Sequence, residues 1–293
     1  MYSNSFGKTI KLFLLDADPE GRVICELSNW TGKAFRIPRG KVKDCANRDD
    51  LKTTGVYLLF GKADTSTGKP RVYIGEAENA FDRLKQHVSK KEFWNEAVVF
   101  FSKDENLNKA HIKYLESRLY EMAVKAGRYE LDNDVTPTRS AISESDTAEL
   151  EEFMAYVKVL LSSLGFKPFE PLVKPVDVSF GSDEERLYLK GRSVSAQGQR
   201  TAEGFVVFAG SEMALESVPS CGASIIKLRN ELIQTGVVEA GSHGHVFKQD
   251  YLFGSPSRAA VVVLGRNTNG LTKWRNSHGI SLKELESDGI EST

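Results

Sequence analysis

Alternating apolar and polar positions predict β-strands in the first fifty residues. Residues 9–15 form an apolar run, residues 18–21 read Asp-Pro-Glu-Gly, and every second residue from 23 to 27 is apolar. Such a pattern is typical of a β-hairpin, because successive side chains of a strand point to opposite faces. We therefore predict a small N-terminal β segment over residues 1–50.

The pattern after residue 50 predicts a second hairpin, a short strand and three helices. Turn residues separate the apolar segments 55–60 and 71–75, and residues 97–102 form a short apolar run. The third helix is expected to begin at Asp146, with Glu149 completing a capping box. Helical spacing of apolar residues gives the three helices as 79–88, 108–126 with Gly127 as its stop, and 146–164.

Three prolines and weak periodicity between residues 166 and 180 predict a linker. The preceding segment, residues 51–165, is expected to form one domain. Residues 181–293 are expected to form a second α+β domain. Its expected elements are strands near 187–190 and 204–208, a helix near 223–234 and a helix that begins at Pro256 after Ser255.

Composition excludes several classes of protein. The 293 residues include 39 Lys and Arg against 40 Asp and Glu, so bulk positive charge cannot hold nucleic acid. A hydrophobic content of 40% is sufficient for folded cores. The three cysteines are far apart in sequence, which predicts neither a disulfide framework nor a CxxC metal site and favours the cytoplasm. No apolar run approaches the ~20 residues of a membrane span.

One short segment is nevertheless strongly basic. Residues 33–43 contain five cations and no carboxylate, and Trp30 and Phe35 lie at or near its start. Basic residues beside aromatic rings can bind phosphates and stack on bases, so the segment is a candidate nucleic-acid contact. The alternative is a solvated strand edge protected by charge. The candidate residues are Lys33, Arg36, Arg39, Lys41 and Lys43.

Two helices carry polar residues that need an explanation. Glu116 lies in the apolar stripe of its helix, where a carboxylate requires a metal ion, a buried arginine or a raised pKa, unless the helix phase is misjudged. On the preceding helix, Arg83 and His87 are spaced i and i+4 on one face. A guanidinium and an imidazole one turn apart could recognise a phosphodiester, or could form an ordinary solvated face.

The hairpin motifs decide between these interpretations. The tripeptides 55–57 (Gly-Val-Tyr) and 73–75 (Tyr-Ile-Gly) resemble the paired motifs of the GIY-YIG nuclease family, with Val in place of the first Ile. The resemblance covers residues 53–135. The loop between the tripeptides, residues 58–72, is longer than is usual in that family. The matching positions, in family order, are Tyr57, Tyr73, Arg83, His87, Glu116 and Asn133.

The resemblance implies a three-stranded antiparallel sheet flanked by helices, and hydrolysis of DNA phosphodiesters with one divalent metal, Mg²⁺ or Mn²⁺, at Glu116. RNA stays an open alternative substrate. Either Tyr57 or Tyr73 would be the general base, supported by His87. Arg83 would neutralise phosphate charge, and Asn133 would position the site through hydrogen bonds.

Other functions and sites stay open. The rivals are a catalytically silent nucleic-acid-binding module and a regulatory subunit of a repair or defence complex. The C-terminal part resembles an uncharacterised domain often found behind such nuclease domains. Its basic residues are DNA contacts or scattered surface charge, and the alternating histidines at 243 and 245, like His111, are weak candidates. These basic residues are Arg229, Lys248, Arg258, Lys273 and Arg275.

Overall fold

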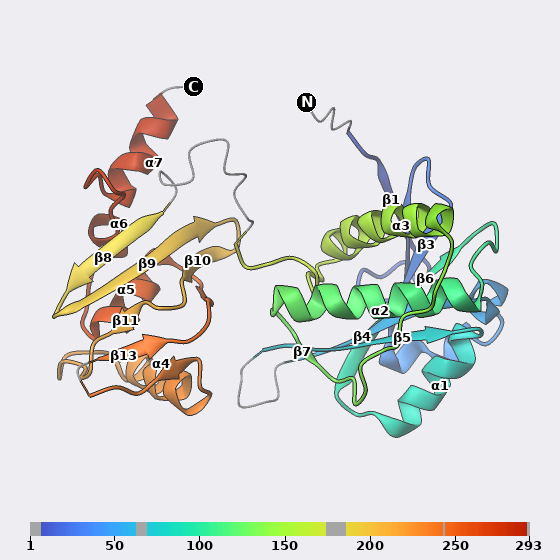
Figure 1. Ribbon diagram of the computed structural model, residues 1–293, viewed down its shortest axis with the longest axis horizontal. Coiled ribbons are helices and arrows are strands. Elements are labelled where there is room, and N and C mark those ends of the chain that lie inside the picture. Colours follow the sequence, from blue (N-terminus) through green and yellow to red (C-terminus); the bar gives the residue numbers. More distant parts are fainter. Residues whose placement is uncertain (1–6, 63–68, 174–185, 243, 292–293) are drawn as a thin grey trace. The chain divides into compact units, whose positions relative to one another are not determined.

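The computed structural model describes residues 7–62, 69–173, 186–242 and 244–291 (Figure 1). The protein has mixed α/β structure with several sheets. Its contacts divide the chain near residue 171 into two compact units, and each unit is described by itself below. The described residues contain no helix that is both long enough and apolar enough to span a membrane.

A seven-stranded sheet of order β1-β2-β3-β6-β4-β5-β7 forms the centre of the first unit. Neighbouring strands pair antiparallel except β5 and β7, which are parallel. The strands are β1 Ile10–Leu14, β2 Val23–Leu27, β3 Gly32–Pro38, β4 Gly55–Gly61, β5 Arg71–Ala77, β6 Trp94–Ser102 and β7 Glu130–Leu131.

The helices of this unit begin at side-chain caps. Asn79 and Asn108 cap α1 and α2, and the predicted stop of α2 at Gly127 is confirmed by its left-handed backbone. Helix α3 begins earlier than predicted, because Ser143 rather than Asp146 accepts the capping hydrogen bond. The helices are α1 Ala80–Lys90, α2 Lys109–Ala126 and α3 Glu144–Ser163, and the short 3-10 helices are η1 Arg39–Lys41, η2 Lys43–Cys45 and η3 Asp49–Lys52.

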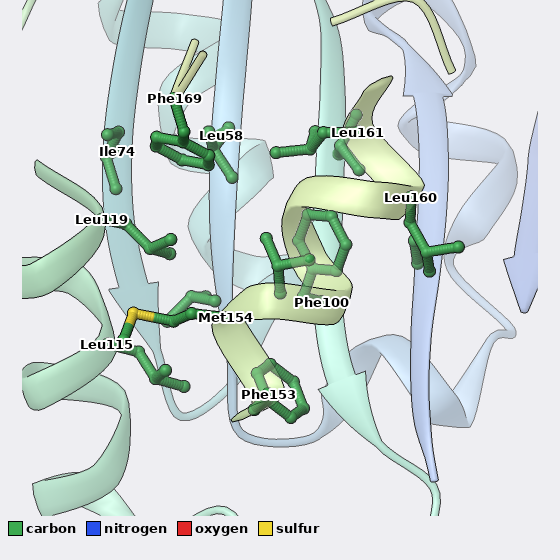
Figure 2. Packing of buried hydrophobic residues seen from close by; sticks show 14 of the residues in the cluster. Leu58, Ile74, Phe100, Leu115, Leu119, Phe153, Met154, Leu160, Leu161 and Phe169 are labelled. Carbon is green, nitrogen blue, oxygen red and sulfur yellow. The ribbon is translucent and has the colours of Figure 1, made fainter. Parts of the chain in front are cut away.

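Alternation along the strands sends side chains into two separate cores. Val56 and Ile74 pack with residues of α2 and α3, whereas Tyr57 and Leu59 pack on the opposite face with residues of α1. Figure 2 shows α2 and α3 contributing Leu115, Leu119, Phe153 and Met154 to the first core. The sheet is therefore covered on both faces.

Three features of this unit differ from the sequence predictions. The N-terminal β segment is part of the same sheet as residues 55–102. The predicted three-stranded sheet is therefore not separate but part of a larger sheet. Its strand β3 is hydrogen-bonded to both β2 and β6, so the interpretation of its cations as edge protection is wrong. The start of the predicted linker belongs to the unit, since Phe166 stacks on Phe60 at 4.0 Å and Phe169 is buried.

In the described residues of the second unit there are two small antiparallel sheets and four helices. Its core includes Phe205, Trp274 and the apolar residues of α5. The predicted helices at 223–234 and after Ser255 are confirmed. The sheet order is β14-β10-β9-β8 and β11-β13-β12. The elements are β8 Leu187–Gly191, β9 Val194–Thr201, β10 Gly204–Val207, β11 Glu212–Met213, α4 Ala223–Gln234, β12 Val238–Glu239, β13 His245–Phe247, β14 Tyr251–Phe253, α5 Pro256–Leu264, α6 Gly270–Lys273 and α7 Leu282–Glu291.

Candidate active site

Strands β4 and β5 and helix α1 bring two tyrosines, a histidine and an arginine together on one face of the sheet. Tyr57 lies opposite Gly75 in the antiparallel ladder, and Tyr73 lies opposite Leu59. A Cβ atom at residue 75 would be 2.4 Å from the Tyr57 hydroxyl and 2.8 Å from the Tyr73 ring. Glycine is needed at this position because the Tyr57 hydroxyl lies directly over its Cα.

The Tyr57 hydroxyl is at the centre of a hydrogen-bond network. Its oxygen lies 2.7 Å from His87 Nε2 and accepts a hydrogen bond of 3.2 Å from Arg83 Nε. Burial lowers the pKa of His87 to about 4, helped by the charges of Arg83 and Lys91, so the imidazole is neutral at pH 7. With Arg83 donating to the oxygen, the Tyr57 proton is directed to Nε2 of this neutral ring.

Tyr57 itself is fully buried, with an exposed fraction of 0%. Burial raises the pKa of its phenol, the neighbouring Tyr73 raises it further, and the Arg83 hydrogen bond opposes both. A phenol in this environment loses its proton only to a group that is already in contact with it. His87 is that group.

Tyr73 is half-buried and lies at the more open side of the network. Its ring centroid is 5.0 Å from that of His87, and the Lys91 ammonium lies 4.8 Å from the centroid of its ring. Lys91 also forms a 2.6 Å ion pair with Asp132. The site therefore holds a second cation, which the sequence motifs did not include.

Asn133 forms hydrogen bonds with the edge of strand β5. Its Oδ1 accepts a 3.1 Å hydrogen bond from the Ile74 amide, and its Nδ2 donates to the Ile74 carbonyl at 2.7 Å. The described pairing of β7 with β5 covers Arg71 and Val72, and the Asn133 side chain continues the edge pairing at Ile74, two residues further along β5. Asn133 thereby fixes the backbone between Tyr73 and Gly75.

Glu116 lies on α2, across the sheet from the tyrosines, and is half-buried. Its pKa is raised to about 7, mainly by burial and next by the charge of Glu76, while Arg83, a backbone hydrogen bond at Glu76 and Lys109 lower it. Lys109 bridges the Glu76 and Glu78 carboxylates at 3.2 and 3.1 Å. Since Arg83 affects the pKa of Glu116, the two side chains act on one another electrostatically around the β5 edge.

These carboxylates suit a divalent cation with few protein ligands. No group of three or more His, Cys, Asp or Glu within the described ranges is arranged to hold a metal. The partly buried Glu116 carboxyl, whose ionisation is disfavoured by burial and by the charge of Glu76, is nevertheless a fit for a hard cation, which would relieve that repulsion. Phosphate oxygens and water would supply the remaining ligands.

The basic segment 33–43 is largely engaged within the protein. Lys33 pairs with Asp50 at 3.0 Å and Arg36 with Glu96 at 3.5 Å. Lys41 pairs with Asp44 at 3.4 Å, and Lys43 is exposed. Arg39 donates to the carbonyls of Val88, Lys91 and Trp94 and stacks on the Trp94 ring. Arg39 thus joins the end of α1 to β6, a structural role that its position in a basic run did not indicate.

The weaker candidates do not join this site. His111 lies 3.6 Å from Asp146 and bonds the loop before α2. His243 lies outside the described residues, and His245 Nε2 lies 3.1 Å from the Leu215 carbonyl oxygen. In the second unit Arg229 is buried and donates to the carbonyls of Ala214 and Val262, while Lys248 pairs with Glu239.

Two site residues were missed although the sequence contains a signal for each. Lys91 continues the i, i+4 spacing of Arg83 and His87 by one more turn. Glu76 follows Gly75 directly, and strand alternation turns it toward the α2 face where Glu116 lies.

Comparison with known proteins bears on the second unit. Residues 187–286 match DUF4357, a domain of unknown function. The DUF4357 match begins at β8 and ends within α7. No curated protein and no solved structure matches the chain.

Proposed function

We propose that the first unit is a metal-dependent endonuclease that hydrolyses DNA phosphodiesters through a GIY-YIG-type site. The observation that carries the proposal is the bonding of one buried tyrosine hydroxyl to both a neutral imidazole and a guanidinium. Strands β4, β5 and β6 with α1 and α2 would correspond to the three-stranded core of that family, extended here by β1 to β3 and β7.

The Tyr57–His87 pair is the better candidate for the general base. A phenol can accept a proton from water only if it gives up its own, and His87 Nε2 lies 2.7 Å away to receive it. Because burial lowers the pKa of His87 and raises that of Tyr57, this transfer would need the negative charge of a bound phosphate, which favours the protonated imidazole. One acceptor position of the Tyr57 oxygen is filled by Arg83 Nε. Movement of Arg83 toward a phosphate would free that position for the attacking water.

Arg83 would then neutralise charge on the phosphate. Its guanidinium already bonds Tyr57 and Gln86, so it is held beside the reacting oxygen before substrate arrives. Lys91, over the Tyr73 ring, adds a second positive charge on the same side of the sheet.

Glu116, with Glu76 beside it, would hold the divalent metal, and Tyr73 would orient the water and substrate at the open side of the network. Bound there, the metal supplies Lewis-acid stabilisation of the phosphate oxygens. Asn133 would keep Tyr73 and Gly75 in register through the Ile74 backbone.

Cleavage of plasmid, branched DNA and single-stranded RNA, each with Mg²⁺ or with EDTA, tests the proposal. We expect Glu116→Ala, Arg83→Ala and Tyr57→Phe each to lower the cleavage rate by about 10²–10⁴-fold, as losses of charge stabilisation and general-base groups usually do. Matched controls are Glu121→Ala on α2 and Lys85→Ala on α1, which leave the network intact.

Undiminished cleavage by Glu116→Ala would refute the metal assignment. Tight binding without cleavage of any of these substrates would favour the silent binding module instead.

A further inference from the structure

A groove in the second unit combines three cations with one aromatic ring. Its cavity has a volume of about 520 Å³ and lies between β8 and the segment that follows α6. It has no carboxylate among its described lining residues. These are Tyr188, Lys190, Lys273, Arg275, Asn276, Ser277 and Gly279.

The backbone explains why these side chains meet. Leu187 and Leu189 of β8 belong to the core, so strand alternation turns Tyr188 and Lys190 to the opposite face. Arg275 forms an antiparallel bridge with Tyr188, with N–O distances of 2.7 and 3.0 Å. Arg275 and the half-buried Tyr188 are therefore cross-strand neighbours.

The cations of the groove are free to bind an anion. Within the part of the chain that the structure describes, Lys190 and Lys273 form no ion pair, and both are exposed. Elsewhere in the same unit, Lys227 pairs with Glu231 at 3.7 Å and Lys248 with Glu239 at 2.9 Å.

Arg275 donates one hydrogen bond of 2.6 Å to the Gly279 carbonyl and keeps further N–H groups. The charge of Arg275 helps to lower the pKa of the nearby Glu284. The Glu284 carboxylate accepts hydrogen bonds of 2.7 Å from the Ser281 hydroxyl and amide. That carboxylate does not line the groove, so the guanidinium stays available to a ligand.

We infer that this groove binds a single strand of nucleic acid, with a base stacked on Tyr188 and backbone phosphates held by Lys190, Lys273 and Arg275. Proteins that bind single strands combine cationic grooves with aromatic platforms, because every base has a face that can stack. In a duplex the bases are stacked on one another, so no base face is free to stack on a half-buried ring. The inference rests on the proposed function only in taking nucleic acid as the ligand.

Binding by the full chain in EDTA tests the inference without cleavage. The probe is a fluorescently labelled DNA strand of about 20 nucleotides, followed by anisotropy at several salt concentrations. We expect Lys190→Ala/Lys273→Ala/Arg275→Ala to weaken binding by at least about tenfold and to reduce the salt slope by about 2, since each lost phosphate contact contributes about 0.7. The matched control is Lys227→Ala/Lys248→Ala, which we expect to bind like the wild type.

The aromatic contribution is tested with Tyr188→Ala and Tyr188→Phe. The alanine variant is expected to weaken strand binding by about tenfold and the phenylalanine variant to retain it, because only the ring is needed for stacking. Thermal unfolding of every variant verifies that the second unit is folded. Binding of a duplex of the same sequence is expected to be weaker and insensitive to Tyr188→Ala.

Three results would overturn the inference: strand binding by the triple variant equal to that of the control, equal loss in both Tyr188 variants, or competition by adenosine monophosphate at equal nucleotide concentration. The last would indicate a mononucleotide site. If the protein binds strands through the groove but cleaves none of the substrates, the nuclease proposal is refuted and the inference about the groove is not.

Discussion

At the scale of single residues, burial disfavours the charged forms of Tyr57, His87 and Glu116. It raises the pKa of Tyr57, lowers that of His87 to about 4 and raises that of Glu116 to about 7. Each change favours the neutral form, because a low-dielectric environment disfavours charge. The site therefore holds its proton donors and acceptors in place around Arg83, the cation that bonds the Tyr57 hydroxyl.

Glu116→Gln is expected to stabilise the metal-free protein at pH 8. Because its pKa is raised, ionisation of Glu116 opposes folding. The protonated group makes its full contribution to stability below about pH 4.5, and this contribution is lost as pH rises through about 7. The variant should gain about 1–3 kcal/mol at pH 8 and nothing at pH 4. Urea unfolding at both pH values measures the difference.

Glu121→Gln on the same helix is the control with the opposite sign. Hydrogen bonds from Arg118 and Arg139 lower the pKa of Glu121, so its ionised form favours the fold and its loss should reduce stability at pH 8. An unchanged stability of Glu116→Gln at pH 8 would contradict the assigned burial effect.

Metal dependence should vary with pH for the same reason. A carboxyl group with a pKa of about 7 is mostly protonated at pH 6, so the Mg²⁺ concentration for half-maximal cleavage should be about tenfold higher at pH 6 than at pH 8. Glu76→Gln removes the repulsion of Glu116 by the Glu76 charge. The rise in the required Mg²⁺ concentration should then occur at a lower pH. A Mg²⁺ requirement that is equal at pH 6 and pH 8 would argue against Glu116 as the ligand.

Gly75→Ala should disrupt the network directly. The added methyl group would lie 2.4 Å from the Tyr57 hydroxyl, so the two tyrosine rings must move apart. We expect a loss of about 1–3 kcal/mol in unfolding free energy and at least about 100-fold in cleavage rate. Gly40→Ala, which meets no atom within 4 Å, is the control and should change neither quantity.

At the scale of elements, the edge of β5 is held by very little regular structure. β7 contains only two residues, and the side chain of Asn133 supplies the next two hydrogen bonds of the edge. A side chain that pairs with backbone in this way needs both a donor and an acceptor, which asparagine has and aspartate lacks.

Asn133→Asp should therefore weaken the edge at Ile74. The ionised carboxylate would face the Ile74 carbonyl without a donor, and we expect a cost of about 1–3 kcal/mol. Hydrogen exchange at the Ile74 amide should become faster relative to that of Leu58, which lies inside the sheet. Unchanged exchange at Ile74 would show that the edge does not depend on this side chain.

Local sequence predicted the helices of the first unit well, because their caps and stops are encoded within a few residues. Asn108 and Gly127 delimit α2 as expected, whereas α3 begins at Glu144, after its cap Ser143, because two nearby residues could each have served as cap. The place of β1 to β3 in the sheet was not predictable, since pairing of β3 with β6 joins residues that are 58 to 70 positions apart in the sequence.

At the scale of the whole molecule, the two units have separate cores. Leu58 belongs to one core and Phe205 to another, and the described residues of each core come from one side of the division near residue 171. Domains with separate cores can unfold in separate transitions.

Leu58→Ala should accordingly lower the melting transition of the first unit alone, by about 2–5 kcal/mol of unfolding free energy. Phe205→Ala should lower only the other transition, and calorimetry of the full chain distinguishes the two. A single transition that shifts equally in both variants would contradict independent cores.

Short spacings along the chain were enough to predict the candidate residues Tyr57, Tyr73, Arg83 and His87, and the one helix that carries the last two. They also placed Glu116 in an apolar stripe. Which groups meet depends on the tertiary structure: the Tyr57–His87–Arg83 bonds, the effect of the Glu76 charge on Glu116, and the assembly of Tyr188, Lys190 and Arg275 in one groove. Each joins side chains from different elements, and strand pairing rather than local spacing fixes their distance.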